Sequence, residues 1–456
     1  MSNLATFLQS AETKAFDSSH RQKLNFNIGK YLDTVKVGKQ QYADLETARK
    51  RAKNIKWRAI EQLDLHLIDF ERNFTRNGGT VIWAKDAQEA VKAVLNIARK
   101  VDARSVVKAK SMVTEEIELN EHLEKAGLKV FETDLGEFIQ QLDGEKPYHI
   151  VTPAMHKSKE DVAKLFHEKL GVEENLTPQQ LTMVARQKLR EEYLRAEIGI
   201  SGANFIIADT GSIAITENEG NARLSTTFPK VHIAIVGIEK VIPSIKDLGL
   251  FWPLLATYGT GQNVTVYSTI LSGPKRDNEA DGPEQMFVIL LDNGRTNVLA
   301  DPDMREAMYC IRCGACLNVC PIYRNIGGHS YATTYSGPIG SIITPHLSGM
   351  EEFKHLSQAS SLCGACTETC PVNIDLHHML LLNRKKAVEQ RLEKDRWMWR
   401  LWRKAMLSRR MMNRGSSGLR NFGFRLLVKK SWAKRRASVE FPKKSFNKLW
   451  TERQKD

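Results

Sequence analysis

The first 309 residues of the sequence contain no cysteine, and all seven cysteines lie between Cys310 and Cys370. An odd number of cysteines in one short stretch argues against a disulfide framework and favours a metal site. No run approaches the roughly 18 apolar residues that a membrane-spanning helix needs. The N-terminus lacks a basic start followed by an apolar core, so we expect the chain to remain in the cytoplasm.

Three common cofactor and catalytic motifs are also missing. The sequence has no G-x-G-x-x-G after a strand, no G-x-x-x-x-G-K-[ST] and no G-x-S-x-G. These absences argue against a resident nicotinamide or flavin, a nucleotide-binding P-loop and an α/β-hydrolase nucleophile. What remains is ordinary for a globular protein of two or three domains, with 456 residues of which 42% are hydrophobic and 26% charged.

The net charge of +14 is concentrated at one end of the chain. Residues 396–456 contain 19 Lys and Arg against three acidic residues, and the remainder is close to neutral. The segment RWMWRLWRKAMLSRRMM combines tryptophan with basic residues, as helices at a membrane surface do. Docking on an acidic partner subunit is the other interpretation. Because the basic charge belongs to a tail, we do not expect nucleic acid as a partner.

The patterning divides the chain into four parts. Residues 1–75 have helical periodicity, and residues 76–300 alternate short apolar runs with amphipathic segments, which predicts an α/β domain with a parallel sheet. Residues 160–198 within it read as helical, and the runs ANFIIAD, SIAITE, VHIAIVG, NVTVYST and MFVILLD read as strands. Residues 301–392 carry the cysteines among short helices, and residues 393–456 form the basic tail.

The cysteines form two related motifs. The first is C-x2-C-x2-C-x3-C-P and the second repeats its last three cysteines and the proline, with Ser360 where a fourth cysteine would stand. In bacterial two-cluster ferredoxins the last cysteine of each motif binds the other cluster. This rule assigns one complete iron–sulfur site to Cys310, Cys313, Cys316 and Cys370, and a second site, one cysteine short, to Cys320, Cys363 and Cys366.

Alternatives remain open at these sites. Zinc also binds clustered cysteines, although structural zinc sites use paired C-x2–4-C motifs rather than four cysteines followed by proline. The second site could hold four irons with a water or serine at one corner, or three irons. Nearby histidines are further candidate ligands, although a surface or core histidine is the more common case: His329, His346, His355, His377 and His378.

The sequence resembles the lactate utilisation protein B family. The resemblance rests on the stretch from ANFIIADTGSIAITENEGNARLSTTF to VIP, on YGTGQNVTVYSTILSGPK, and on CIRCGACLNVCPIY and LCGACTETCPV, and it extends over roughly residues 20–390. It implies an α/β lactate-utilisation domain whose sheet is similar to those of sugar isomerases and coenzyme A transferases, followed by a helical ferredoxin-type domain. It also implies two [4Fe-4S] clusters on the seven cysteines.

Several polar turns of the α/β domain are weaker candidates. Asp209-Thr210-Gly211-Ser212 and Glu217–Asn221 stand at strand ends, where sites in α/β sheets gather, but turns require the same residue types. Gly259-Thr260-Gly261-Gln262 could cradle an anion or form an ordinary loop. Lys240, after a strand, is either a solvated strand-end residue or a ligand contact.

We therefore expect a non-catalytic electron-transfer subunit that works with the other subunits of an L-lactate oxidation system. The basic tail would place it in the cytoplasm or at the inner face of the membrane. One alternative is the iron–sulfur subunit of another dehydrogenase, acting on a 2-hydroxy acid such as glycolate or on a polyol such as glycerol phosphate. The other is a redox-sensing regulatory protein.

Overall fold

The computed structural model describes residues 2–393, 397–413, 417–418, 421–423, 425–426 and 442–455. The chain forms two units, Met1–Glu389 and Gln390–Asp456. The first unit contains both β-sheets and all seven cysteines, and the described residues of the second unit include three helices, α20, α21 and α23.

Four helices precede the first strand, as the periodicity predicts. Three of them begin at a residue whose side chain accepts a hydrogen bond from the backbone of the first turn, namely Ser2, Asp17 and Asp44. The four helices are α1 (Asn3–Phe16), α2 (Ser18–Gly38), α3 (Leu45–Glu61) and α4 (Leu63–Arg76).

The main sheet has six parallel strands in the order β1-β10-β7-β4-β2-β3. The strands are β1 (Thr80–Ala84), β2 (Ser105–Lys108), β3 (Lys129–Glu132), β4 (Ile198–Ser201), β7 (Val231–Gly237) and β10 (Gln285–Leu291). The predicted parallel sheet is confirmed. The short strand β4 was not predicted, because its four residues include a glycine and directly follow a long helical pattern.

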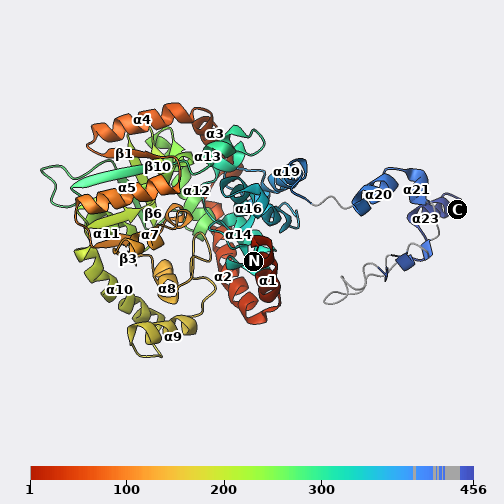
Figure 1. Ribbon diagram of the computed structural model, residues 1–456, viewed down its shortest axis with the longest axis horizontal. Helices are drawn as coiled ribbons and strands as arrows, with labels where there is room; N and C mark the ends of the chain where they lie inside the picture. Colours follow the sequence, from red (N-terminus) through yellow and green to blue (C-terminus); the bar gives the residue numbers. More distant parts are fainter. Residues whose placement is uncertain are drawn as a thin grey trace. The chain divides into compact units, whose positions relative to one another are not determined.

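Helices cover both faces of this sheet (Figure 1). Alternate residues of β10 point to opposite sides: Ile289 packs in a core with α5, and Leu290 in a core with α4. The covering helices are α5 (Ala87–Lys100), α6 (Met112–Glu116), α7 (Leu119–Lys125), α8 (Leu135–Asp143), α9 (Lys159–Leu170), α10 (Pro178–Arg195), α11 (Asn221–Thr227) and α13 (Arg295–Ala300). The left-handed backbone at Glu118 separates α6 from α7 within the segment EEIELNEHLEKAG.

A second, four-stranded sheet has the order β8-β5-β6-β9. Its strands are β5 (Phe205–Ile207), β6 (Ser212–Glu217), β8 (Val241–Ile242) and β9 (Tyr267–Leu271). The predicted parallel arrangement is wrong for β6, which pairs antiparallel with β5 and β9, whereas β5 and β8 pair parallel. The turn between β5 and β6 is too short for the crossover that parallel neighbours require. Helix α12 (Leu248–Thr260) packs beside this sheet, with Phe251 against Phe205.

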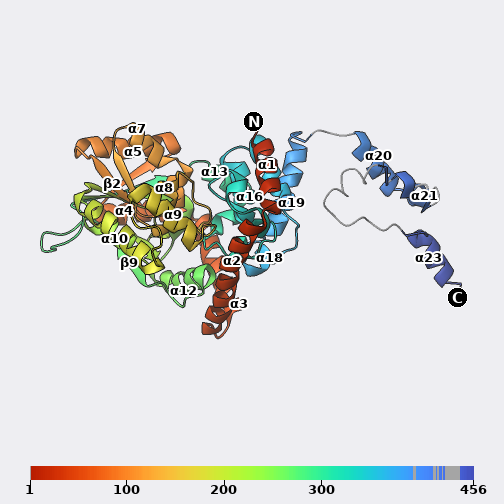
Figure 2. The same ribbon diagram turned by 90° about the horizontal axis from the view of Figure 1, so that it is seen from below.

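The cysteine-bearing part of the first unit consists of short helices, as predicted. They are α14 (Ala315–Val319), α15 (Tyr323–Ile326), α16 (Gly337–Leu347), α17 (Met350–Phe353), α18 (Ala365–Thr369) and α19 (Leu376–Glu389). Figure 2 shows α1 and α2 beside this part. Phe7, Leu24 and Ile28 of these helices share one hydrophobic core with Leu317 and Tyr323. The two ends of the first unit therefore fold together.

The second unit contains α20 (Trp397–Met406), α21 (Arg409–Asn413) and α23 (Phe446–Arg453). No helix in the described part of the chain combines the length and the apolar character needed to cross a membrane. Most of the predicted basic tail between α21 and α23 lies outside the described residues.

Candidate metal centre

The first cysteine motif forms a tight loop that leads into α14. Arg312 and Gly314 both have a left-handed backbone, with φ of 62° and 76°, and this reverses the chain between successive cysteines. The backbone N–H of Arg312 donates a hydrogen bond to Cys310 Sγ at 3.4 Å. Cys313 and Cys316 are buried.

The second motif adopts the same backbone conformation. Leu362 and Gly364 repeat the left-handed positions, with φ of 54° and 82°, and lead into α18. The N–H of Leu362 donates to Ser360 Oγ at 3.1 Å, just as that of Arg312 donates to Cys310 Sγ. Ser360 therefore takes the place of Cys310 in a structural repeat.

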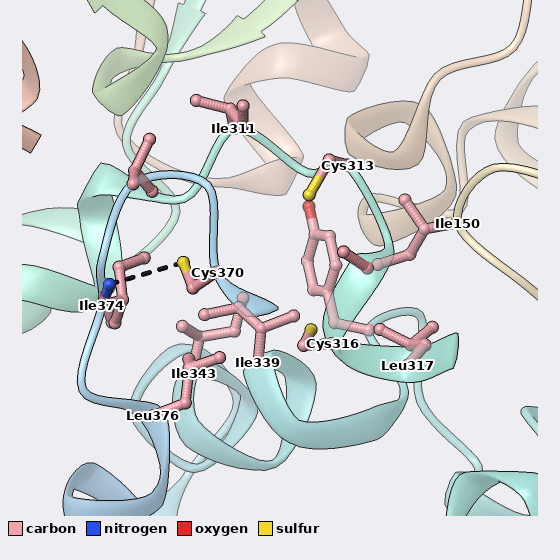
Figure 3. Packing of buried hydrophobic residues seen from close by; sticks show 14 of the residues in the cluster. Ile150, Ile311, Cys313, Cys316, Leu317, Ile339, Ile343, Cys370, Ile374 and Leu376 are labelled. Carbon is pink, nitrogen blue, oxygen red and sulfur yellow. Dashed lines mark hydrogen bonds between the residues drawn. The ribbon is translucent and has the colours of Figure 1, made fainter. Parts of the chain in front are cut away.

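Four cysteines from the two motifs line one small cavity. Cys310, Cys313 and Cys316 come from the first motif and Cys370 from the second, and the other walls are mostly apolar, including Ile150, Ile311, Ile339, Val372, Ile374 and Leu376. Figure 3 shows Cys313, Cys316 and Cys370 among these side chains, with the N–H of Ile374 bonded to Cys370 Sγ at 3.4 Å. We call this cavity site 1. It brings together the four cysteines that the sequence rule assigned to one cluster.

The surroundings of site 1 suit cysteines that bind an iron–sulfur cluster better than cysteines that remain as free thiols. Burial raises the pKa of Cys370 to about 12 and raises the pKa of Cys316 well above its usual range. These groups would stay neutral without a cation, whereas a bound metal deprotonates thiols and is held by them. Four soft sulfur ligands in an apolar pocket are the donor set that iron–sulfur clusters use.

The other three cysteines, Cys320, Cys363 and Cys366, are called site 2. Burial raises the pKa of Cys366 to about 11, and the charges of Cys320 and Cys363 add to the effect. Cys363 is exposed, and hydrogen bonds from the Ala365 N–H and the Ser361 hydroxyl hold its pKa below the usual value.

The two sites differ in how they are covered. A side chain at Gly314 would meet Val151 at 3.0 Å and His149 at 3.2 Å, whereas one at the equivalent Gly364 would meet nothing within 4 Å. The loop around His149 thus covers the first motif at Gly314, whereas Gly364 of the second motif, next to the exposed Cys363, is uncovered; Cys320 and Cys366 are buried.

A buried ion-pair network joins the parallel sheet to site 1. Arg295 donates from Nε to Glu239 Oε2 at 2.6 Å and from Nη2 to Glu116 Oε2 at 2.8 Å. The Tyr335 hydroxyl donates to the same Glu116 oxygen at 2.6 Å. Arg312, from the first cysteine motif, lies 3.6 Å from Glu239 and stacks over the Tyr335 ring.

This network lies at the edge of the sheet where ligands of α/β domains commonly bind. Glu116, Glu239 and Arg295 follow the carboxyl ends of β2, β7 and β10, three strands of one parallel sheet. None of the three was singled out from the sequence. Only their common place at strand ends could have drawn attention to them.

Two buried lysines add positive charge beside the network. Lys56 of α3 donates to the backbone oxygens of Glu239 at 2.6 Å and Val241 at 3.2 Å, and burial lowers its pKa to about 7. Lys240 is 7% exposed, and burial lowers its pKa to about 8. Reading Lys240 as a solvated strand-end residue was therefore wrong.

Helix α3 also holds the second cysteine motif. Arg49 donates from Nε to the Cys370 carbonyl oxygen at 3.0 Å, and Lys53 donates to the Asn373 carbonyl oxygen at 2.9 Å. With Lys56 these residues follow the i, i+4, i+7 spacing of one helix face. A basic stripe on a helix is usually solvated, so the sequence alone did not reveal this contact.

The weaker sequence candidates have structural roles. Asp209 Oδ1 accepts the N–H of Ile245, and Glu217 accepts those of Ala222 and Arg223. The turn interpretation is correct for both. Gly259 and Thr260 belong to the last turn of α12, so they do not form an anion cradle.

The candidate histidines have other neighbours. In the described part of the chain, no hydrogen bond joins any of these five histidines to a cysteine sulfur. His329 bonds the Lys146 carbonyl oxygen, His346 bonds Asn383, His377 bonds Thr367, and His355 packs beside Phe7.

Glu239→Gln tests the buried network. Burial acts to raise the pKa of Glu239, but Arg295 and Arg312 outweigh it and hold the pKa at about 2. The stabilisation by the Glu239 charge is thus fully present above about pH 4.3, the pKa of a glutamate in the unfolded chain. It is lost only as the pH falls toward 2. The substitution leaves buried guanidinium charge uncompensated, and we expect a loss of about 3–5 kcal/mol in unfolding free energy at pH 7.

The matched control is Glu61→Gln, which breaks a part-exposed pair with Arg305. We expect it to cost about 1 kcal/mol or less. Both losses of unfolding free energy are measured by denaturant unfolding. Equal losses in the two variants would show that the buried network stabilises the fold no more than a part-exposed ion pair does.

Comparison with known proteins agrees with this architecture. Residues 67–291 match the model of the LUD domain, and residues 306–374 match that of the 4Fe-4S dicluster domain. A solved structure of a DUF162 family protein from Deinococcus radiodurans covers 50% of this chain and 98% of its own, at 15% identity, but its TM-score of 0.30 is too low to carry an argument.

Curated relatives cover much more of the chain. Lactate utilization protein B from Bacillus thuringiensis (strain Al Hakam) is 46% identical over 360 residues, which are 79% of this chain and 76% of the relative. The proteins of that name from Bacillus cereus (strain AH187) and Bacillus anthracis (strain A0248) match with the same identity and coverage. The chain therefore belongs to the lactate utilization protein B family.

Proposed function

We propose that this chain is the iron–sulfur electron-transfer subunit of a system that oxidises L-lactate to pyruvate. Membership of the family supports the role in lactate utilisation and the presence of other subunits. The observation that carries the electron-transfer role is the cavity lined by Cys310, Cys313, Cys316 and Cys370. Bound there, a [4Fe-4S] cluster would accept and release single electrons.

The two sites are close enough to exchange electrons because each short helix serves both. Cys316 and Cys320 lie at the two ends of α14, and Cys366 and Cys370 at the two ends of α18, about one helical turn apart. The helices α14 and α18 contact each other. Each helix thus carries one ligand for site 1 and one for site 2.

The surroundings of site 1 favour relay over substrate chemistry. With four thiolates at four corners, every iron would be fully ligated and no position would remain open for a substrate. The backbone N–H groups of Arg312 and Ile374 donate to two of the sulfurs, and apolar side chains keep water away. We therefore place lactate oxidation itself on a partner subunit.

The second unit offers a surface for attachment. Trp397, Trp399 and Trp402 of α20 are 69%, 62% and 56% exposed, and Arg403 and Lys404 follow on the same helix. Exposed indole rings beside basic residues match the interface of an anionic membrane. We propose that α20 attaches the complex to the inner face of the membrane.

The first prediction concerns metal content. Anaerobically purified protein should contain about seven to eight irons per chain with matching sulfide, because two cuboidal sites hold that number. Plasma emission spectrometry and sulfide analysis measure it. Stoichiometric zinc with negligible sulfide would contradict the proposal.

The second prediction is that brief exposure to air removes iron from site 2 before site 1. A serine hydroxyl holds iron less firmly than a thiolate, and Ser360 stands where Cys310 stands in the first motif. Electron paramagnetic resonance should then show a three-iron signal while site 1 persists, and Ser360→Cys should slow its appearance. Absence of that signal, or its persistence unchanged in Cys363→Ser, would show that the ligands are wrongly assigned.

The third prediction tests the attachment. Trp399→Ala combined with Trp402→Ala should weaken binding to phosphatidylglycerol vesicles more than tenfold, because each buried indole contributes about 1.5–3 kcal/mol. Phe446→Ala on α23, whose side chain is 77% exposed, serves as the control and should leave binding unchanged. Sedimentation with vesicles at two salt concentrations measures both. Equal binding of all three proteins would refute a role for α20.

A further inference from the structure

Two histidines and a glutamate come together outside the two cysteine motifs. Glu145 and His156 stand at the two ends of one loop after α8, and His329 follows α15 in the cysteine-bearing part. One ligand atom from each of these residues lies within 4.8 Å of the others, and all three residues are partly buried. Imidazole and carboxylate groups together are a donor set that zinc prefers in proteins.

Two of these ligand atoms are already spaced nearly as they would be on one metal ion. His156 Nε2 lies 3.0 Å from Glu145 Oε2. Zinc bonds of about 2.0–2.1 Å at tetrahedral angles place neighbouring ligand atoms about 3.3 Å apart, so only a small adjustment is needed. The rings of His156 and His329 are neighbours as well, with centroids 5.1 Å apart and planes inclined by 66°.

Neighbouring groups hold both imidazole rings in place. The buried Tyr148 stacks on His156 with ring centroids 4.4 Å apart and meets the edge of His329 at 4.9 Å. His329 Nε2 bonds the Lys146 carbonyl oxygen at 2.7 Å, so the neutral ring carries its proton there and keeps the Nδ1 lone pair. Histidines that bind metals usually have their other ring nitrogen fixed in this way. In the described part of the chain, His156 Nδ1 is buried without a hydrogen-bond partner.

An ion-pair cluster without a metal is the alternative interpretation. Lys157 Nζ lies 3.1 Å from Glu145 Oε2 and also pairs with Asp143. Lys157 therefore keeps one carboxylate when Glu145 binds a metal. The ion pair also leaves unexplained why the His329 ring lies beside His156, because His329 bonds a carbonyl oxygen rather than the glutamate.

A polar cavity gives solvent access to these residues. It has a volume of about 400 Å³, and His20, Lys23, His156 and Lys157 are among the residues that line it. Zinc held by three protein ligands keeps a fourth position for water or another small ligand. The cavity provides both the entry path for the ion and the water for that position.

We propose that Glu145, His156 and His329 bind one zinc ion. The ion joins both ends of the loop that carries His149 to the cysteine-bearing part of the chain. Because this loop covers the first cysteine motif at Gly314, the zinc ion clamps the cover of site 1. The zinc site needs only the fold of the first unit and stands whether or not the cysteines hold iron.

Zinc binding is measured on the full chain, purified anaerobically, by calorimetric titration with zinc chloride after removal of loosely bound metal. One zinc ion per chain is expected, and X-ray absorption at the zinc edge should show nitrogen and oxygen neighbours at about 2.0–2.2 Å. Sulfur neighbours at about 2.3 Å in their place would put the zinc on the cysteines and overturn the proposal. Magnesium chloride should give no binding, because magnesium prefers oxygen ligands, and equal binding of the two salts would contradict a zinc site.

Variants of the three ligands test the assignment. Loss of an outer hydrogen-bond partner alone costs about 10–100-fold in metal affinity, so His156→Ala or His329→Ala should weaken zinc binding by about a hundredfold or more. His122→Ala makes the same change at an exposed histidine of α7 and should leave zinc binding unchanged. If an alanine variant fails to fold, Glu145→Gln keeps the size of the side chain and carries the same expectation. Unchanged affinity in the ligand variants, or an equal loss in His122→Ala, would overturn the assignment.

Amide hydrogen exchange tests the clamp separately from the affinity. Zinc should slow the exchange of residues 146–155 in the full chain, and His329→Ala should abolish this slowing, because the loop then loses its link to the cysteine-bearing part. Mass spectrometry of peptides from this segment measures both. Exchange that zinc does not change would show that the ion does not hold the loop.

Discussion

Balance of buried charge at one edge of the parallel sheet is the constraint on which this structure depends. Glu239 holds Arg295 of the α/β domain and faces Arg312 of the cysteine loop, so one carboxylate joins the sheet to site 1. Arg295 also pairs with Glu116, so the two carboxylates and the two guanidinium groups form one buried network.

This constraint explains why the ends of the first unit fold together. Helix α3 supplies Arg49 and Lys53 to the second cysteine motif and Lys56 to the sheet edge, so it connects three segments that are distant in sequence. The helices α1 and α2 close the core beneath them (Figure 2). The cysteine domain thus occupies the sheet edge where many α/β proteins bind a ligand.

Local patterns predicted the parallel sheet and the grouping of four cysteines around one cavity, because strand periodicity and the C-x2-C-x2-C-x3-C-P spacing are local. They did not reveal the second sheet, although the short turn between β5 and β6 indicates an antiparallel pair. The sequence could not predict the buried contacts of Lys56, Glu116 and Arg295, because their partners lie far away in sequence. Burial of Lys240 depends on the same long-range packing. That the cysteines hold iron stays a prediction.

The central claim is that the cysteines build two separate iron–sulfur centres, one enclosed at the charged sheet edge and one that includes the exposed Cys363. Anomalous diffraction at the iron edge, from crystals grown without oxygen, tests it most directly. The account predicts two peaks, one inside the cavity of Cys310, Cys313, Cys316 and Cys370 and one beside Cys320, Cys363 and Cys366. A single peak shared by the two motifs, or peaks that appear only at the zinc edge, would contradict it.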